Sequence, residues 1–262
     1  MLAAELLAAY DRQVRTSLGG RLPAGWELSW DGPLMRVSGG FRGFVGYRNL
    51  AGLRGAELDA LIERTCGYYD ARGEAFEWKW HSHDQPSNLA DRLLAHGFLP
   101  EDPEKVLVGM ASELTESPPL PAGVRIVEVT AEADLRRIGK LESEVWHEDW
   151  SWLAEDLIER RSADPELLPV FAAEAGGRYV SAAWLSCNPG TDFAGLWGGS
   201  TLADWRGRGI YRVLVAVRAR RAVRQGYRYL QVDASPDSRP ILGRLGLVEI
   251  TSTRPYVHGT AG

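Results

Sequence analysis

The residues best suited to chemistry are a glycine turn and its arginines, Arg206-Gly207-Arg208-Gly209. An apolar run through Leu196 and Trp197 precedes the turn and predicts a strand, and apolar residues recur after it at the spacing of one helical face. The first turn of a helix carries amides without an intrahelical acceptor, and the helix dipole places partial positive charge there. Glycines let the backbone turn tightly and let a phosphate approach. The stretch therefore predicts a strand, a turn and a helix that bind a pyrophosphate.

Two common nucleotide-binding motifs do not fit this turn. The phosphate loop of NTPases needs a Lys followed by Ser or Thr after its glycines, and neither pair follows here. The dinucleotide fingerprint needs a third glycine where this sequence has Arg212. The turn therefore predicts another kind of phosphate site.

The stretch resembles the Gln/Arg-x-x-Gly-x-Gly/Ala signature of the GNAT superfamily of acyl-CoA-dependent N-acetyltransferases. Arg206 and Gly209 fit this signature, whereas Tyr211 stands where the family usually has Gly or Ala. The run from Asp233 to Leu247 is similar to a second family landmark, a strand, a polar loop and a short helix that ends in Gly-Phe. The resemblance implies a mixed α/β (α+β) fold, with a mostly antiparallel twisted sheet, flanking helices and a splayed central strand pair.

The two halves of the chain resemble each other. In each half a helix ends at a glycine, Gly73 or Gly226, and is followed by a strand, a loop and a short helix ending at Gly97 or Gly246. Such self-similarity predicts a duplicated domain. With the family resemblance it implies tandem GNAT folds: a domain at residues 1–114, a Pro-rich linker at 115–122 and an acyl-CoA-binding domain at 123–262.

The N-terminal copy differs at the turn. It lacks the second glycine and carries Glu57 and Asp59 in the first turn of its helix. Carboxylates there suit the helix dipole but repel a phosphate. We expect this copy to be degenerate and structural.

The resemblance implies that acetyl-CoA is the co-substrate. Its pantetheine arm would enter the gap beside the strand at 193–202, because a splayed strand has free amides and carbonyls that accept an added strand. Gly198 and Gly199 suit a bulge there, and the alternative is that they only kink a twisted sheet. The residues expected to bind the co-substrate are Ser200, Thr201, Leu202, Arg206, Gly207, Arg208, Gly209, Ile210, Tyr211 and Ser238.

Within this set the amides at 200–202 would bind the acyl carbonyl, and those at 206–211 the pyrophosphate. Arg206 and Arg208 would pair with phosphates, while most other arginines up to Arg224 are expected on a solvated helix face. Ser238 begins the short helix and contacts the co-substrate or serves only as its N-cap.

Acyl transfer needs a base, because an amine with a pKa of about 10.4 is almost wholly protonated at neutral pH. The candidate base is Glu148, with His147 and Asp149 beside it, in the loop where GNAT proteins build the acceptor pocket; the alternative is an exposed acidic turn. The family's usual acid is a Tyr four residues before Gly-Phe, where this sequence has Leu242. The candidate substitutes are two other tyrosines, Tyr211 and Tyr256.

The chain as a whole excludes several classes of protein. Its formal net charge of −5 disfavours a nucleic-acid partner, and it has no apolar run long enough to span a membrane. The N-terminus follows a helical pattern rather than that of a signal peptide. Cys66 and Cys187 lack metal-type spacing, which predicts no disulfide framework, no zinc and a reducing cytoplasm. His81 and His83 share one side of a strand without further ligands, so we expect no metal site.

These observations predict an N-acetyltransferase that moves the acetyl group of acetyl-CoA to a primary amine by direct attack. The acceptor is a small molecule or a peptide, and the protein a monomer or homodimer. The alternative, motivated by Leu242, is a non-catalytic acyl-CoA-binding sensor or regulatory module. Five tryptophans line an aromatic acceptor pocket or pack in the core: Trp146, Trp150, Trp152, Trp184 and Trp197.

Overall fold

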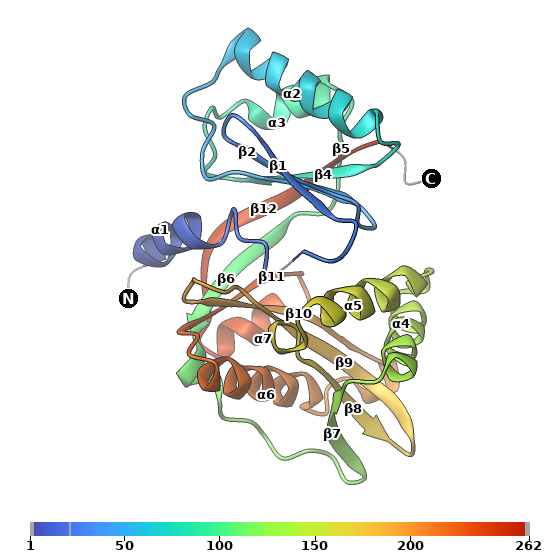
Figure 1. The fold of residues 1–262 in the computed structure, drawn as a ribbon. Coiled ribbons are helices and arrows are strands. Elements are labelled where there is room, and N and C mark those ends of the chain that lie inside the picture. Colours follow the sequence, from blue (N-terminus) through green and yellow to red (C-terminus); the bar gives the residue numbers. More distant parts are fainter. Residues whose placement is uncertain (1–2, 21, 260–262) are drawn as a thin grey trace.

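The strands of this protein form one sheet. The computed structural model describes residues 3–20 and 22–259. The described strands are β1 (Glu27–Asp31), β2 (Leu34–Ser38), β3 (Gly43–Gly46), β4 (Phe76–His81), β5 (Leu99–Pro100), β6 (Glu104–Met110), β7 (Val124–Val129), β8 (Val170–Ala175), β9 (Arg178–Cys187), β10 (Phe193–Thr201), β11 (Tyr229–Ala234) and β12 (Val248–His258). Their order is β1-β2-β3-β4-β12-β6-β11-β10-β9-β8-β7, with β5 paired to β12 (Figure 1). Among them only β3 with β4 and β10 with β11 pair in parallel, which confirms the predicted mostly antiparallel sheet.

Helices cover both faces of this sheet. The described α-helices are α1 (Ala3–Gln13), α2 (Gly55–Asp70), α3 (Leu89–Ala95), α4 (Glu132–Trp146), α5 (Ser151–Ala163), α6 (Ile210–Arg224) and α7 (Arg239–Arg244). Alternate residues of one strand face opposite layers: Tyr229 of β11 packs with Tyr10 of α1, whereas its neighbour Leu230 packs with Val215 of α6. Within the part of the chain that is described, no helix is long and apolar enough to cross a membrane.

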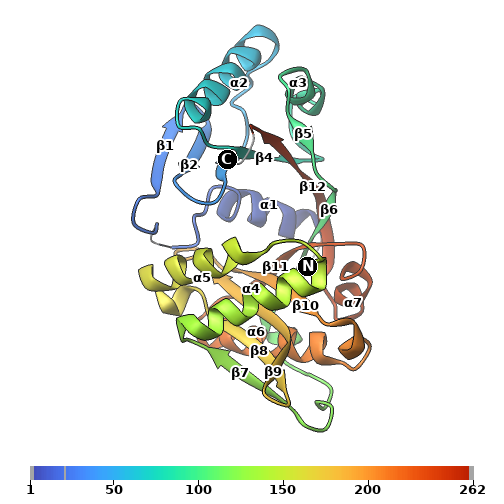
Figure 2. The same ribbon diagram turned by 90° about the vertical axis from the view of Figure 1, so that its right-hand side faces the viewer.

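The sheet passes through both predicted halves without a break. β6, from residues before 114, pairs with β11, and β12, from the end of the chain, pairs with β4. On the two sides of the junction of β12 and β6, β4 to β1 follow β12 as β11 to β8 follow β6, and β7 has no counterpart. The domain boundaries at 114 and 123 stay a prediction. Strands from before residue 114 form hydrogen-bonded pairs with strands from after residue 123. Figure 2 shows α1 between the upper and lower parts of the molecule.

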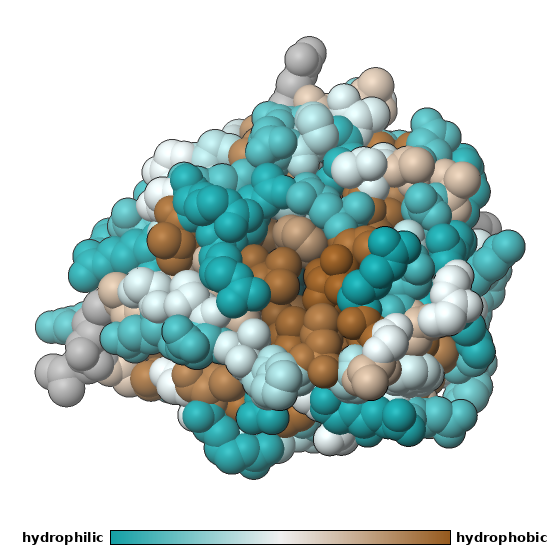
Figure 3. Space-filling model, turned by 90° about the horizontal axis from the view of Figure 1, so that it is seen from below, coloured by the Kyte–Doolittle hydropathy of each residue, from teal (hydrophilic) through white to brown (hydrophobic). Residues whose placement is uncertain are grey.

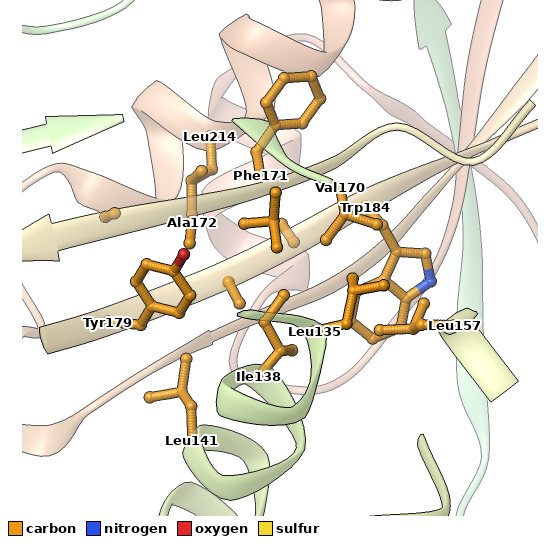
Figure 4. Packing of buried hydrophobic residues seen from close by; sticks show 14 of the residues in the cluster. Leu135, Ile138, Leu141, Leu157, Val170, Phe171, Ala172, Tyr179, Trp184 and Leu214 are labelled. Carbon is orange, nitrogen blue, oxygen red and sulfur yellow. The ribbon is translucent and has the colours of Figure 1, made fainter. Parts of the chain in front are cut away.

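The largest apolar cluster lies in the lower part of the molecule, where α4 and α5 pack on β8 and β9. Figure 4 shows Leu135, Ile138 and Leu157 directed at Trp184 and Val170 of the sheet. In α4 the buried residues Leu135, Ile138 and Leu141 follow one helical face, and this explains why the segment folds as a helix against the sheet. The molecule seen from below has an apolar hollow in its middle, surrounded by polar residues (Figure 3).

Candidate active site

The parallel strands β10 and β11 part soon after they meet. They pair only from Phe193 with Tyr229 to Gly195 with Gln231, although both strands continue. The register of β10 against β9 shifts between Gly198 and Ser200, where a bulge forms. A Cβ at Gly198 would collide with the Trp184 ring, so the close approach requires glycine. The splayed pair and the bulge are both confirmed. We call the point where the strands part, at Gly195 and Gln231, the fork.

The turn before α6 presents a row of free amides. Gly207 and Gly209 have φ angles of 72° and 82°, a region that glycine adopts without strain. The amides from Gly207 to Arg212 donate to no acceptor among the described residues, and the first turn of α6 has no acidic side chain. Pro118 of the linker lies beside Gly209, 3.2 Å from where a Cβ would stand. The helix end therefore keeps its hydrogen-bond donors for an anion.

The arginines near the turn have different roles. Arg206 and Arg208 are exposed; Arg206 Nε donates to the Thr201 carbonyl at 2.9 Å, and Arg208 lies over the Trp205 ring. Arg218 is buried and is therefore an exception to the solvated face expected for most arginines of this stretch. It donates to the carbonyls of Leu214, Trp184 and Trp197 and thereby ties α6 to β9 and β10. Burial lowers the pKa of Arg218 to about 10.

Tyr211 lies between the bulge and the start of α7. Its ring fills the space next to Gly199, and its hydroxyl hydrogen-bonds with Ser238. Burial raises the pKa of Tyr211, which keeps the phenol protonated. Ser238 is the N-cap residue of α7, but its side chain makes no capping hydrogen bond. Leu242 is fully buried in the apolar cluster, so this position offers no acid.

The other predicted catalytic residues are not brought to the fork. Glu148 is exposed in the loop after α4 and has no hydrogen bond or ion pair with a described residue. Asp149 accepts a hydrogen bond from the Ser151 amide at the start of α5, which lowers the pKa of its carboxyl group. Tyr256 is buried in the upper part of the molecule, in a cluster with Trp78 of β4. Of the predicted trio, the structure places only Tyr211 beside the parted strands.

A carboxyl group that the sequence analysis missed lies at the bulge. Glu142, on α4, is 2% exposed, and its Oε2 accepts hydrogen bonds from Ser200 Oγ at 2.6 Å and from Trp146 Nε1 at 3.0 Å. Its Oε1 is buried and has no hydrogen-bond partner in the described structure. Burial raises the pKa of Glu142. The available signal was a carboxylate within the apolar stripe of a predicted helix, next to Leu141.

A cavity of about 210 Å³ opens on the α1 side of the fork. Gly195 and Trp197 of β10 and Gln231 and Asp233 of β11 line one wall. Residues of α1, β3 and β4 from the N-terminal half line the other wall, including Tyr10, Lys79 and His81. Both halves of the chain therefore build this cavity, which we call the fork cavity.

The fork cavity does not include most of the tryptophans considered as an acceptor pocket. Trp197 lines it and is 45% exposed, whereas Trp184 is buried in the core. Trp146, Trp150 and Trp152 lie next to one another at the start of α5, and Trp152 stacks on Phe41 at 4.1 Å between ring centroids. Trp152 thereby connects the C-terminal part of the chain to Phe41 of the N-terminal part. The described residues contain no group of three or more His, Cys, Asp or Glu side chains placed to hold a metal.

Comparison with known proteins gives a consistent result at the level of the fold. No protein-family model matches the sequence, and neither does any curated protein. Among solved structures, a GCN5-related N-acetyltransferase from Kribbella flavida is 17% identical, with a TM-score of 0.69 over 99% of this chain and 96% of that chain. A tandem GNAT protein from the clavulanic acid biosynthesis pathway is 15% identical, with a TM-score of 0.62 over 92% and 85% of the two chains.

A further similar structure is a GCN5-related N-acetyltransferase from Sphaerobacter thermophilus, 15% identical, with a TM-score of 0.60 over 99% of this chain and 94% of that chain. All three span nearly the whole length of this chain and not one half alone. These likenesses support the resemblance carried by the glycine turn. The chain therefore has the fold of the GNAT acetyltransferases.

Proposed function

We propose that this protein is an acyl-CoA-dependent N-acetyltransferase that moves an acetyl group from acetyl-CoA to a primary amine. The observation that carries the proposal is the joint presence of two features at one place in the fold. The strands β10 and β11 part after Gly195, and a row of free amides from Gly207 to Arg212 follows on the same strand–turn–helix unit. The parted strands can accept an extended pantetheine arm as an added strand, and the free amides can bind the phosphates of the same molecule.

The residues present fit acetyl-CoA. The amides of the turn, with Arg206 and Arg208, would bind the phosphates, and the unpaired edge of β10 after Gly195 would bind the pantetheine arm. When bound, acetyl-CoA supplies an activated acetyl group. The fork cavity, on the α1 side of the same strands, would then hold the acceptor amine.

Glu142 replaces Glu148 as our candidate general base. Its carboxyl group is buried at the bulge, with Oε2 fixed by Ser200 and Trp146 and Oε1 free to accept a proton. The raised pKa of Glu142 strengthens it as a base, because proton transfer is most efficient when the pKa lies near the working pH. The acid for the departing thiol is Tyr211, whose phenol is kept protonated by burial and held by Ser238.

The alternative remains a binding module without catalysis. It is favoured by one observation, the fully buried Leu242 at the position where the family usually has its acid. Both functions predict acetyl-CoA binding, and they differ in turnover. Release of free CoA thiol on addition of amines supports the enzyme, whereas tight binding with no transfer to any amine supports the sensor.

A thermal-shift titration with acetyl-CoA tests the binding site. At about 100 times the dissociation constant, binding is expected to add roughly 2.7 kcal/mol to the free energy of unfolding. Gly209→Glu places a carboxylate at the free amides and is expected to abolish this gain. Gly209→Gln is the matched control, since it has the same positive φ and the same size without the charge. Equal stabilisation of the Glu and Gln variants by acetyl-CoA would contradict the assigned site.

A further inference from the structure

Carboxyl groups outnumber cationic groups around Lys79, a residue that lines the fork cavity. Lys79 forms an ion pair with Asp233, and the carboxyl groups of Glu77 and Glu104 also act on Lys79 electrostatically. One ammonium group therefore stands among three carboxyl groups. Burial raises the pKa of Glu77 and that of Glu104, the latter to about 7. A further cation beside them would stabilise their ionised forms.

The other cationic groups nearby are already shared with further carboxyl groups. Arg42 lies 3.8 Å from Glu77 and 2.9 Å from Glu101. Arg15 is paired with Asp84 at 2.6 Å and lies 3.5 Å from Asp11. His81 is neutral, because burial and the charge of Arg15 lower its pKa well below the usual range. The carboxyl groups around the Lys79 side of the cavity therefore favour a cation over an anion there.

Two buried acceptor atoms on β11 lack a donor. Gln231 Oε1 and Asp233 Oδ1 have no hydrogen-bond partner among the described residues, and Gln231 is only 6% exposed. Both residues line the cavity from the same face of the strand. Gln231 stands at the fork, opposite Gly195, and Asp233 lies two residues further along β11, where β11 still pairs with β6 but no longer with β10. Buried acceptors without a donor are costly, and a ligand with N–H groups would satisfy them.

We infer that the acceptor carries a second cationic nitrogen, which Asp233 and Gln231 bind in the fork cavity while the first amine reacts beside Glu142. The inference rests on the proposed transferase function. An ammonium group has three donors and no acceptor, which matches two free oxygens next to a buried carboxylate. The cavity volume of about 210 Å³ suits a small, unbranched diamine better than a peptide chain.

Isothermal titration calorimetry without acetyl-CoA tests this inference independently of turnover. The probes are diaminobutane, diaminohexane and diaminooctane, each compared with the monoamine and the ω-amino acid of the same chain length. At least one diamine is expected to bind about tenfold or more tightly than its monoamine, the effect of one charge-assisted hydrogen bond. The amino acid, with its carboxylate, should bind more weakly than the monoamine. Monoamines that bind as tightly as the diamines would overturn the inference.

Two variants assign the effect to β11. Asp233→Asn is expected to lower the preference for the diamine over its monoamine about tenfold. Gln231→Met removes the free amide oxygen and leaves the Lys79–Asp233 pair intact, so it keeps the test valid if Asp233→Asn fails to fold. Asp237→Asn, at an exposed position after β11, is the matched control. A preference for the diamine that is as large in both variants as in Asp237→Asn would overturn the assignment.

The two proposals fail separately. If amines release CoA but monoamines bind and react as well as diamines, the transferase function is supported and the inference of a second cationic nitrogen is refuted. If no amine releases CoA while the diamine preference depends on Asp233 and Gln231, the diammonium site stands and the transferase is refuted.

Discussion

At the residue scale, the candidate chemistry depends on a carboxyl group that a helix buries and not on the acidic loop after it. Glu142 is held at the bulge by Ser200 and Trp146, whereas Glu148 is exposed six positions later. A base needs a fixed position near the reacting atoms and a pKa above that of an exposed carboxyl group. Ser200 and Trp146 hold the carboxyl group of Glu142 in place and burial raises its pKa, and these two properties support the proposal that Glu142 is the base.

Glu142→Gln is therefore expected to lower kcat for acetyl transfer by about 10²-fold, the contribution typical of a general base, with little change in the KM for acetyl-CoA. Because burial raises the pKa of Glu142, the ionised form, which accepts the proton, accumulates as pH rises through that value. kcat of the wild type should rise over this range, and the variant should lose that rise. Steady-state kinetics across pH check both effects.

The control for this prediction is Glu144→Gln on the same helix. Glu144 is exposed and pairs with Arg178, away from the bulge. A Glu142→Gln enzyme with the pH profile of Glu144→Gln would show that another group accepts the proton.

At the element scale, α6 does more than present its amides. Arg218 connects this helix to the carbonyls of Trp184 on β9 and Trp197 on β10, directly before the bulge. No carboxylate of the described chain lies within ion-pair distance of Arg218, so main-chain dipoles alone stabilise its charge. The helix and the bulge are thus held in one geometry by a single planar side chain.

Arg218→Lys is expected to destabilise the fold by about 2 to 4 kcal/mol, because an ammonium group cannot reach the three carbonyls together and leaves buried acceptors unpaired. Chemical denaturation measures the change in free energy of unfolding. Arg224→Lys, at an exposed position of the same helix, serves as the control and should change it by less than about 0.5 kcal/mol. Similar stabilities of the two variants would show that the buried hydrogen bonds of Arg218 do not hold the helix.

At the scale of the whole molecule, the N-terminal and C-terminal parts of the chain exchange strands. β6 lies between β12 and β11, so the sheet of the C-terminal half is completed by residues 104–110. The fork cavity is likewise lined from both halves. The N-terminal part of the chain thus has a structural role, because it supplies a strand and one wall of the cavity.

A fragment of residues 115–262 is expected to be unfolded or insoluble when produced alone, because β11 would lose β6 and β12 would lose β4, β5 and β6. Exposed strand edges of this length favour aggregation. Co-production with residues 1–114 should restore a soluble complex that binds acetyl-CoA. Circular dichroism and gel filtration check this, and a folded, monomeric fragment would show that the predicted boundary marks an independent domain.

The sequence by itself determined the features that depend on neighbouring residues. The turn at Arg206–Gly209 could be predicted because glycines, a strand and a helical pattern follow one another within a short stretch. The bulge at Gly198 and Gly199 followed from the same local logic.

The tertiary structure alone decided the features that depend on distant residues. The roles of Glu142, Arg218 and the fork cavity arise from contacts among helices and strands far apart in the chain. The exchange of β6 and β12 has the same origin, since a strand's pattern of alternation fixes which face is buried but not which neighbour it pairs with.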